Sequence, residues 1–535
     1  MKTILTSKAA KAADVYTVAS CNTSDEQLIH LAATAVLQTL QTEGYDLRKP
    51  LVLCGSGNNG ADGMQLACLL KEGEAEVQIL YLGALYEQPA PTKKAPKKNA
   101  APAKEIDPAL YGTPDIDKMS EQCGAHYQRV LAAEIPILTA LPEDLSDLSL
   151  VVDAVYGTGM HGAIKDARVC NTFDSINRTQ IPVVAIDIPS GVACDTGAVD
   201  AHALCAAHTV TMQQEKVGVL LYPGAEYAGK ITVADIGIKT DPACTAAVMR
   251  ALQDEDANAL LPRRPLRSNK GTFGRVLIVA GTPGMAGAAY LAAMAAYRAG
   301  AGLVEILTTS KNRIVLQQLI PEAIVTCYAD MRSLKKALKD ATFRANAIVL
   351  GCGLGRSKAS AYSVSYVLRN ALVPVVVDAD ALNIIAKNPA LLKRVSKSQK
   401  LQTVITPHPV EAARLLGKKT AGADVLKNLT AAADQLCDKY QVNVLLKDAH
   451  TLICSHDKAT RYVNLSGSTA LAGAGSGDVL AGYIGGLCAA KAPEQPVVTT
   501  AALAAYLHGK AGEKAEATVG AQAAMARDIL NALTK

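Results

Sequence analysis

The chain has 535 residues and a formal net charge of +5, from 54 Lys and Arg against 49 Asp and Glu. This weak charge balance argues against nucleic acid or an anionic membrane as a partner, and the absence of Trp disfavours base-stacking surfaces. Apolar residues make up 50% of the chain, enough for the cores of two to four domains.

Short β-branched runs alternate with Ala- and Leu-rich stretches along the whole chain, a pattern typical of parallel α/β folds. We predict two α/β domains, over residues 1–245 and 246–535. The Pro-, Ala- and Lys-rich segment 87–104 is predicted to be a mobile insertion in the first domain. The predicted strands are Leu51–Cys54, Val77–Leu80, Leu150–Asp153, Val183–Asp187, Val276–Ala280, Val304–Thr308, Ala347–Leu350, Val375–Asp378, Val404–Thr406 and Val444–Lys447.

The N-terminus contains no apolar run typical of a signal peptide, and no segment offers about 18 consecutive strongly apolar residues for a membrane span. The 13 cysteines are scattered singly, so neither a zinc site nor a disulfide framework is indicated. We therefore predict a cytoplasmic protein without a membrane partner.

Three Gly- and Asp-containing segments lie at strand ends of the first domain: Gly55–Gly63, Val151–Gly162 and Ala185–Gly191. Ligands of open α/β sheets bind beyond the carboxyl ends of the strands, so we interpret the three loops as one pocket. On its glycines alone, the first loop is explained equally well as a tight turn with Asn and Asp helix caps.

Oxygen-bearing side chains in these loops suit two kinds of chemistry. Asn59, Asp153 and Ser190 offer hard oxygen ligands for a cation. Asp187 is a candidate acid–base group, although a strand-end Asp is often only a loop cap.

Together these blocks resemble the epimerase domain of the NAD(P)H-hydrate repair enzymes, also called the YjeF N-terminal domain family. The resemblance covers about residues 14–238 and includes Thr209–Gly218 and Tyr222–Gly224. It implies a Rossmann-like three-layer domain that interconverts the R and S forms of hydrated NADH and NADPH (NADHX and NADPHX), with Asp187 as the catalytic residue. It also implies a potassium ion held by Asn59, Asp153 and Ser190, and further substrate contacts from Asn58, Asn59, Gly60, Ala61, Asp62, Gly157, Thr158, Gly159, Met160 and His161.

The second half begins with Gly-rich segments of uncertain meaning. Gly281–Ala289 and Gly351–Gly355 permit close approach of a ligand, but close helix–sheet packing explains them as well. Val377–Asn383 and Thr406–Glu411 are sharper signals, because both place titratable side chains at predicted strand ends.

The strongest signal of the second half is the turn Gly475–Gly477, which is followed by Asp478. Successive N–H groups at the start of a helix form an anion-binding nest, and Asp478 can act as a general base beside a bound phosphate. A Gly-rich turn with a helix-initiating acid is the structural alternative. We prefer a functional interpretation because the nest coincides with the other strand-end groups.

Residues 267–533 resemble the ADP- or ATP-dependent NAD(P)H-hydrate dehydratases, which have a ribokinase-like α/β/α fold. Two departures from the usual pattern are Cys352 in place of Pro and Asp448 in place of Gly. The resemblance implies Mg²⁺ with ADP or ATP as cofactors. It implies that Ala288, Gly355, His408 and Asp478 contact the hydrated nucleotide, and that Lys447, Asp448, Ala449, His450, Thr451, Gly475, Ser476 and Gly477 bind the adenine nucleotide.

These resemblances lead to one mechanistic hypothesis. Asp478 would remove the proton of the hydrate hydroxyl as that hydroxyl attacks the terminal phosphate, and elimination of the phosphate would restore the dihydropyridine. The epimerase domain would convert the R hydrate to the S form that the second domain consumes, and the chain is expected to form a homo-oligomer. The alternative is a ribokinase-type kinase of a small molecule, such as a vitamin precursor, fused to a non-catalytic nucleotide-binding domain.

Overall fold

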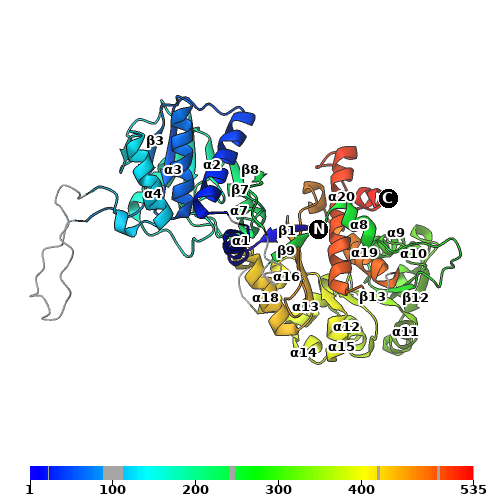
Figure 1. Cartoon of the computed structure of the whole chain (residues 1–535). Helices are drawn as coiled ribbons and strands as arrows, with labels where there is room; N and C mark the ends of the chain where they lie inside the picture. The colour runs from blue at the N-terminus through cyan, green and yellow to red at the C-terminus, as the bar shows by residue number, and fades with distance from the viewer. Residues whose placement is uncertain (22, 88–111, 240–247, 418–421, 491–494, 534–535) are drawn as a thin grey trace, which may run out of the picture. The chain divides into compact units, whose positions relative to one another are not determined.

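The computed structural model describes residues 1–21, 23–87, 112–239, 248–417, 422–490 and 495–533. The chain divides into two compact units, Ile4–Val248 and Met249–Lys535, the second of which includes Met1–Thr3 (Figure 1). The predicted insertion, apart from Glu87, and the predicted boundary after residue 245 lie outside the described residues.

A seven-stranded parallel sheet forms the centre of the first unit, in the order β4-β3-β2-β5-β6-β7-β8. Its central strands are in register: Val52 pairs with Val152, which pairs with Val184. These strands are buried on both faces, which explains why their sequences are continuous apolar runs. The strands are β2 (Pro50–Cys54), β3 (Gln78–Tyr81), β4 (Ile137–Leu138), β5 (Leu150–Ala154), β6 (Val183–Ile186), β7 (His208–Met212) and β8 (Lys230–Ala234).

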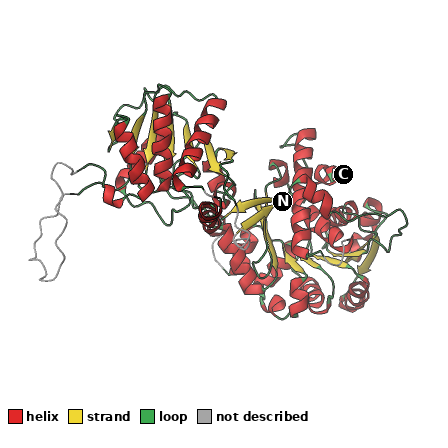
Figure 2. Ribbon diagram, in the orientation of Figure 1, coloured by secondary structure: helices red, strands yellow, loops and turns green. Residues whose placement is uncertain are grey.

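Helices cover both faces of this sheet, so the unit has three layers (Figure 2). Val52 and Val152 pack into a core with residues of α2, α3 and α4, whereas Leu51 and Val151 pack on the opposite face with residues of α5. The helices are α1 (Ser7–Ser20), α2 (Asp25–Thr42), α3 (Asn58–Glu72), η2 (Ile116–Lys118), α4 (Glu121–Ala132), α5 (Ala167–Asn177), α6 (Val217–Leu220) and α7 (Gly224–Ala228).

An eleven-stranded sheet of the order β1-β9-β18-β17-β16-β15-β14-β13-β10-β11-β12 organises the second unit. The run from β12 to β16 is parallel, and β17 and β18 add antiparallel strands next to β16. The strands are β1 (Lys2–Leu5), β9 (Val248–Ala251), β10 (Arg275–Val279), β11 (Leu303–Thr309), β12 (Ile324–Tyr328), β13 (Ala347–Leu350), β14 (Val375–Val377), β15 (Thr403–Ile405), β16 (Asn443–Leu446), β17 (Thr451–Cys454) and β18 (Arg461–Asn464).

The helices of the second unit also form two layers around their sheet (Figure 2). On one face α19 packs closely on α9. This packing is possible because Gly482 has no side chain: a Cβ there would lie 2.0 Å from the Ala292 carbonyl oxygen. The helices are α8 (Asp254–Leu260), α9 (Ala286–Arg298), η4 (Ser310–Asn312), α10 (Arg313–Leu319), α11 (Met331–Arg344), α12 (Lys358–Asn370), α13 (Ala379–Lys387), α14 (Ala390–Lys393), α15 (Lys397–Leu401), α16 (Pro409–Leu416), α17 (Ala423–Leu426), α18 (Leu429–Tyr440), η5 (Thr469–Ala472), α19 (Ser476–Ala490), α20 (Val497–Val519) and α21 (Ala526–Ala532).

The predicted α/β class is confirmed, and each predicted strand is present to within two residues at either end. The antiparallel strands β17 and β18 were not predicted, since the sequence pattern suggested a uniformly parallel sheet. None of the helices in the described part of the chain is both long and apolar enough to span a bilayer.

Candidate active sites

The first unit contains a cavity of about 720 Å³ beyond the carboxyl ends of β2, β5, β6 and β7. Gly60 and Ala61 lie beneath its wall: Ala61 is fully buried, and a Cβ on Gly60 would lie 2.1 Å from the Gly55 carbonyl oxygen. The other predicted substrate-binding residues of this half line the cavity: Asn58, Asn59, Asp62, Gly157, Thr158, Gly159, Met160, His161 and Asp187.

The loop after β2 is both a tight turn and an exposed set of donors. A Cβ on Gly55 would lie 2.2 Å from the Val155 carbonyl oxygen, so only glycine permits the two loops to pack together. The N–H of Ala61 donates to the Gly57 carbonyl at 3.2 Å, which leaves the N–H groups of Asn58 and Asn59 at the free N-terminus of α3. Such a terminus, facing the cavity, suits an anionic ligand.

Asp153 and Ser190 form a fully buried pair at the ends of β5 and β6. The Ser190 hydroxyl donates to Asp153 Oδ1 at 2.6 Å, and the Ser190 N–H donates to Oδ2 at 2.7 Å. Burial raises the pKa of Asp153 to about 6, against the opposing effect of these hydrogen bonds. Among the described residues no cationic side chain forms an ion pair with this carboxylate.

The predicted third cation ligand, Asn59, lines the neighbouring cavity, and its amide Nδ2 is buried without a hydrogen-bond partner. The amide oxygen and nitrogen exchange places on a simple flip of the side chain. A buried carboxylate, a hydroxyl and an unsatisfied amide are a donor set that fits a hard monovalent cation. The structure therefore supplies suitable chemistry for the potassium ion predicted from the sequence.

Asp187 lies at the end of β6 in a left-handed backbone conformation, with φ of 69°. Its Oδ1 accepts a hydrogen bond from the ammonium group of Lys216, which is buried and also donates to the Met212 carbonyl at 2.8 Å. The positive φ is unusual for a non-glycine residue and is held by the N–H of Asp187, which donates to the Val210 carbonyl at 2.8 Å. The cavity thus holds one firmly positioned carboxylate with its own counter-ion.

Three further carboxyl groups, those of Asp14, Asp25 and Asp62, line this cavity. Burial raises the pKa of Asp62 well above its usual value, and repulsion from Asp187 adds to the effect. Asp14, on α1, and Lys216 were given no role from the sequence. Lys216 stands in the segment Thr209–Gly218 that carried the resemblance, but nothing in the sequence near Asp14 indicates that α1 borders the cavity.

In the second unit, the predicted anion-binding turn forms the start of α19. Gly475 has φ of +92°, and a Cβ there would lie 2.6 Å from Leu291 Cδ1, so glycine is required for the turn itself. The N–H of Val479 donates to the Gly475 carbonyl at 3.1 Å and the N–H of Ser476 donates to the Gly473 carbonyl at 3.4 Å, which leaves the N–H groups of Gly477 and Asp478 at the free end of the helix. The Ser476 hydroxyl lies 3.3 Å from Nε2 of buried His508, and this hydrogen bond stabilises the turn.

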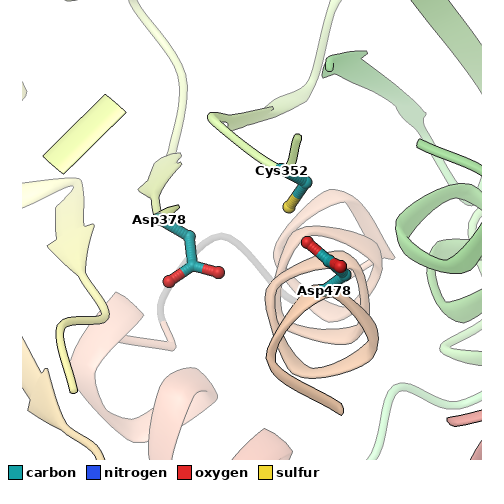
Figure 3. A group of neighbouring side chains, drawn as sticks. All are labelled: Cys352, Asp378 and Asp478. Carbon is teal, nitrogen blue, oxygen red and sulfur yellow. The ribbon is translucent and has the colours of Figure 1, made fainter. Parts of the chain in front are cut away.

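Asp478, in the first turn of α19, points toward Cys352 and Asp378 (Figure 3). One ligand atom from each of the three residues lies within 4.8 Å of the others. Burial raises the pKa of Asp478 to about 6; repulsion from Asp378 adds to this rise, and the hydrogen bond with Cys352 opposes it. Near neutral pH this carboxyl group can therefore both accept and release a proton.

Lys447 and Asp378 join this cluster through a short ion pair. Lys447 Nζ donates to Asp378 Oδ1 at 2.8 Å, and the Thr406 hydroxyl donates to the same oxygen at 2.8 Å. A Cβ on Gly477 would lie 3.4 Å from Lys447 Nζ, so the lysine stands directly beside the helix N-terminus. The segment Val377–Asn383 was identified in the sequence by its titratable side chains at a predicted strand end, but Asp378 was assigned no role there.

His408 borders the same group of charges. Its ring caps α16, with Nδ1 accepting the N–H of Val410 at 3.2 Å and Nε2 lying 3.6 Å from Glu411. Burial lowers the pKa of His408, and nearby Lys447 lowers it further. Burial raises the pKa of Glu411 to about 7.

The remaining predicted residues lie in the first turn of α9, in the loop after β13 and in the turn that follows β16. Ala288 packs under Gly353, where a Cβ would lie 2.9 Å from the Ala288 methyl, and the N–H of Gly355 donates to Asp380 at 2.8 Å. The segment Lys447–Thr451 forms the turn from β16 to β17. Burial raises the pKa of Asp448 in this turn, and its Oδ2 is buried without a hydrogen-bond partner.

Two family models match the chain, and they cover different parts of it. The model for YjeF-related protein N-terminus matches residues 25–218, and the NAD(P)H-hydrate dehydratase model matches residues 276–535. The bifunctional NAD(P)H-hydrate repair enzyme of Moorella thermoacetica is 36% identical over 91% of this chain and 87% of its own length. The chain belongs to the bifunctional NAD(P)H-hydrate repair enzyme family. The Escherichia coli member is 32% identical over 95% of this chain and 89% of its own length.

Among solved structures, similar chains align with about half of the protein. The ADP/ATP-dependent NAD(P)H-hydrate dehydratase from Bacillus subtilis, co-crystallised with ATP and Mg²⁺, is 31% identical, with a TM-score of 0.46. The alignment covers 52% of this chain and 95% of that one. A ribokinase-like superfamily protein from Enterococcus faecalis is 27% identical with a TM-score of 0.45, covering 53% of this chain and 94% of its own.

Proposed function

We propose that the chain repairs hydrated NADH and NADPH by two successive activities. The first unit interconverts the R and S hydrates, and the second dehydrates the S form at the expense of ADP or ATP. Family membership supports this pairing. The observation that carries it is the convergence of Asp478, Lys447 and the free N-terminus of α19 on one point, because phosphate activation of a hydroxyl needs a base, a cation and a nest together.

In the second unit, Asp478 is proposed to take the hydroxyl proton as the hydroxyl oxygen bonds to the terminal phosphorus. The bond from phosphorus to the bridging oxygen breaks, giving AMP from ADP, or ADP from ATP. The phosphorylated hydroxyl then leaves as phosphate with the electron pair of its C–O bond, and the neighbouring ring carbon loses a proton to solvent, which forms the C=C bond of the dihydropyridine. Lys447 and the N–H groups at the start of α19 would stabilise the charge on the transferring group. Mg²⁺, when bound with the nucleotide, neutralises phosphate charge.

Residues of α9 and of the loops at the carboxyl edge of the sheet are proposed to position the two nucleotides. Ala288, Gly355 and His408 would contact the hydrated coenzyme, and the turn Lys447–Thr451 with Gly475–Gly477 would hold the adenine nucleotide. The Oδ2 atom of Asp448 in that turn is buried without a hydrogen-bond partner, so it suits a hydrogen bond with a ribose or adenine group.

In the first unit, the cavity is proposed to hold the hydrated coenzyme, with a phosphate group near the start of α3. Asp187 would face the hydroxyl-bearing carbon, and Asn59, Asp153 and Ser190 would hold a potassium ion that balances the buried charge of Asp153. Asn58 and Gly157–His161 would line the coenzyme. A cytoplasmic location and a homo-oligomeric state remain predictions of the sequence.

The test uses separated R and S hydrates of NADH with the purified full chain. Without nucleotide, either hydrate should be converted to a mixture of both. With Mg²⁺ and ADP or ATP, supplied in separate reactions, the S hydrate should regain the NADH absorbance band. Failure of both nucleotides to restore that band would contradict the dehydratase assignment, and nucleotide consumption only with a vitamin precursor would support the kinase alternative.

A further inference from the structure

Asp14 lines the cavity of the first unit. It lies outside the region matched by the family model for YjeF-related protein N-terminus, which begins at residue 25. It lies on α1, while Asp187 and Lys216 belong to loops at the carboxyl edge of the sheet. Asp14 is exposed to solvent within the open cavity. Desolvation by the surrounding atoms, followed by repulsion from Asp187, raises the pKa of Asp14 to about 6.

The charges around Asp14 and Asp187 give these two carboxyl groups different properties. Asp187 is hydrogen-bonded to the Lys216 ammonium, so it is held as the anion of an ion pair. Asp14 lies close enough for repulsion from Asp187 and Asp25, and it is itself one of the charges that raise the pKa of Asp62. Lys11, Tyr156, His161 and Lys165 complete the ionisable lining of the cavity.

Epimerisation of a hydrated dihydropyridine requires two groups, an acid and an anion. Water adds to an enamine so that the hydroxyl group is attached to the carbon next to nitrogen. Inversion of that carbon needs the C–O bond to break with its electron pair leaving on oxygen, while the nitrogen lone pair forms a C=N⁺ bond. An acid must protonate the departing oxygen, and an anion must stabilise the cation that remains.

We propose that Asp14 is a catalytic acid of the epimerase, donating a proton to the departing hydroxyl, while Asp187, held by Lys216, stabilises the cation. Water then adds to the opposite face of the C=N⁺ carbon and releases a proton, which returns to the Asp14 carboxylate through the solvent of the open cavity. The step consumes no co-reactant, because one water leaves and one enters. This assignment rests on the proposed epimerase activity and adds a residue to it.

The experiment measures equilibration of separated R and S hydrates, without nucleotide, by wild type and by three variants of the full chain. Asp14→Asn keeps the shape of the side chain but cannot act as an acid, and we expect a rate loss of about 10²-fold. Asp14→Glu keeps the acid and should regain a substantial part of the rate. Asp25→Asn is the comparison variant, because Asp25 is also an exposed carboxyl of the cavity, on the next helix; it should keep most of the rate and move the pH profile slightly to lower pH, since its charge is a minor cause of the raised pKa of Asp14.

Three outcomes decide between the possibilities. The wild-type rate should fall as the pH rises above about 6, where Asp14 loses its proton, and this dependence should be absent from Asp14→Asn. Equal rates for wild type and Asp14→Asn, or equal losses in Asp14→Asn and Asp14→Glu, would overturn the role of Asp14. Failure of the wild type itself to equilibrate the hydrates would instead reject the proposed epimerase. Dehydration of the S hydrate, catalysed by the other unit, should be unchanged in all variants and reports that the chain is intact.

Discussion

The two candidate sites share one arrangement of charges on two different sheets. Each contains a lysine–aspartate ion pair, Lys216–Asp187 in the first unit and Lys447–Asp378 in the second. Each also contains a second carboxyl group with its pKa raised to about 6, Asp14 and Asp478 respectively. In both sites the pair fixes one negative charge, and a second carboxyl group beside it can change protonation near neutral pH.

The sites differ in which carboxylate can reach a ligand. Asp187 lines the open cavity, so the paired carboxylate itself faces the substrate position. The Asp378 side chain is only 3% exposed, so the half-buried Asp478 in the first turn of α19 is the more accessible carboxylate. The same charge pattern therefore supports electrostatic stabilisation of a cation in the first unit and proton abstraction in the second.

The largest expected effect separates the two activities. Asp478→Asn removes the proposed base, so the rate of S-hydrate dehydration should fall by about 10²–10⁴-fold. The measurement is recovery of the NADH absorbance band with saturating nucleotide. Equilibration of the R and S hydrates by the same variant should remain at the wild-type rate, and loss of both activities would contradict the independence of the two sites.

A second prediction concerns the ion pair of the first unit. Lys216→Met leaves Asp187 and the Met212 carbonyl without their buried donor, which should destabilise this unit by about 3 kcal/mol. Hydrogen–deuterium exchange of β6 and β7 in the full chain measures the change, and epimerase activity should fall with it. Lys230→Met is the control, because its ion pair with Glu43 is exposed and should contribute little. Equal exchange in both variants would show that the Lys216 pair has no special role.

The sequence was sufficient for most of the central parallel strands and for the loops that follow them, but the parallel strands β4, β7, β8 and β12 were not predicted. Apolar runs such as Leu51–Cys54 predict buried parallel strands because both faces of the sheet are covered, and sites follow at their carboxyl ends. The strands β17 and β18 were not predicted, because the prediction relied on the alternation of strands with helices. A short antiparallel pair beside a parallel sheet has no helix between its strands and does not show that alternation.

Within the sites, single residues marked by a motif were easier to predict than their partners. Asp478 follows a glycine turn, and Asp187 follows a strand, so each has a local signal. Asp14 and Cys352 have none: Asp14 reaches the cavity from a helix far away in the sequence, and Cys352 reaches Asp478 across 126 residues only because β13 and α19 pack together. Contacts of this kind depend on tertiary packing and not on local pattern.

The third prediction tests the second-unit pair through pH. Asp378→Asn removes a negative charge that raises the pKa of Asp478, so the acid side of the dehydratase pH profile should move below about 6. A shift of half a pH unit increases activity on that side roughly threefold relative to the plateau. Asp380→Asn, which removes the weaker of the two repelling carboxylates, should shift the profile less. A profile that is unmoved in Asp378→Asn would show that the pair does not control Asp478.

The smallest expected effect has the opposite sign and comes from the other neighbour of Asp478. The Cys352 thiol donates a hydrogen bond to Asp478, and this bond lowers the pKa of the carboxyl group by favouring its ionised form. Cys352→Ala removes the donor, so the acid side of the dehydratase profile should move slightly above about 6, with the plateau rate nearly unchanged. The first unit has no equivalent thiol near Asp14 among its described cavity residues, and the epimerase profile of this variant should be the same as that of wild type. Opposite shifts of the dehydratase pH profile in Cys352→Ala and Asp378→Asn, measured in the same assay, would show that these two neighbours together control the protonation of Asp478. Shifts in the same direction would contradict this.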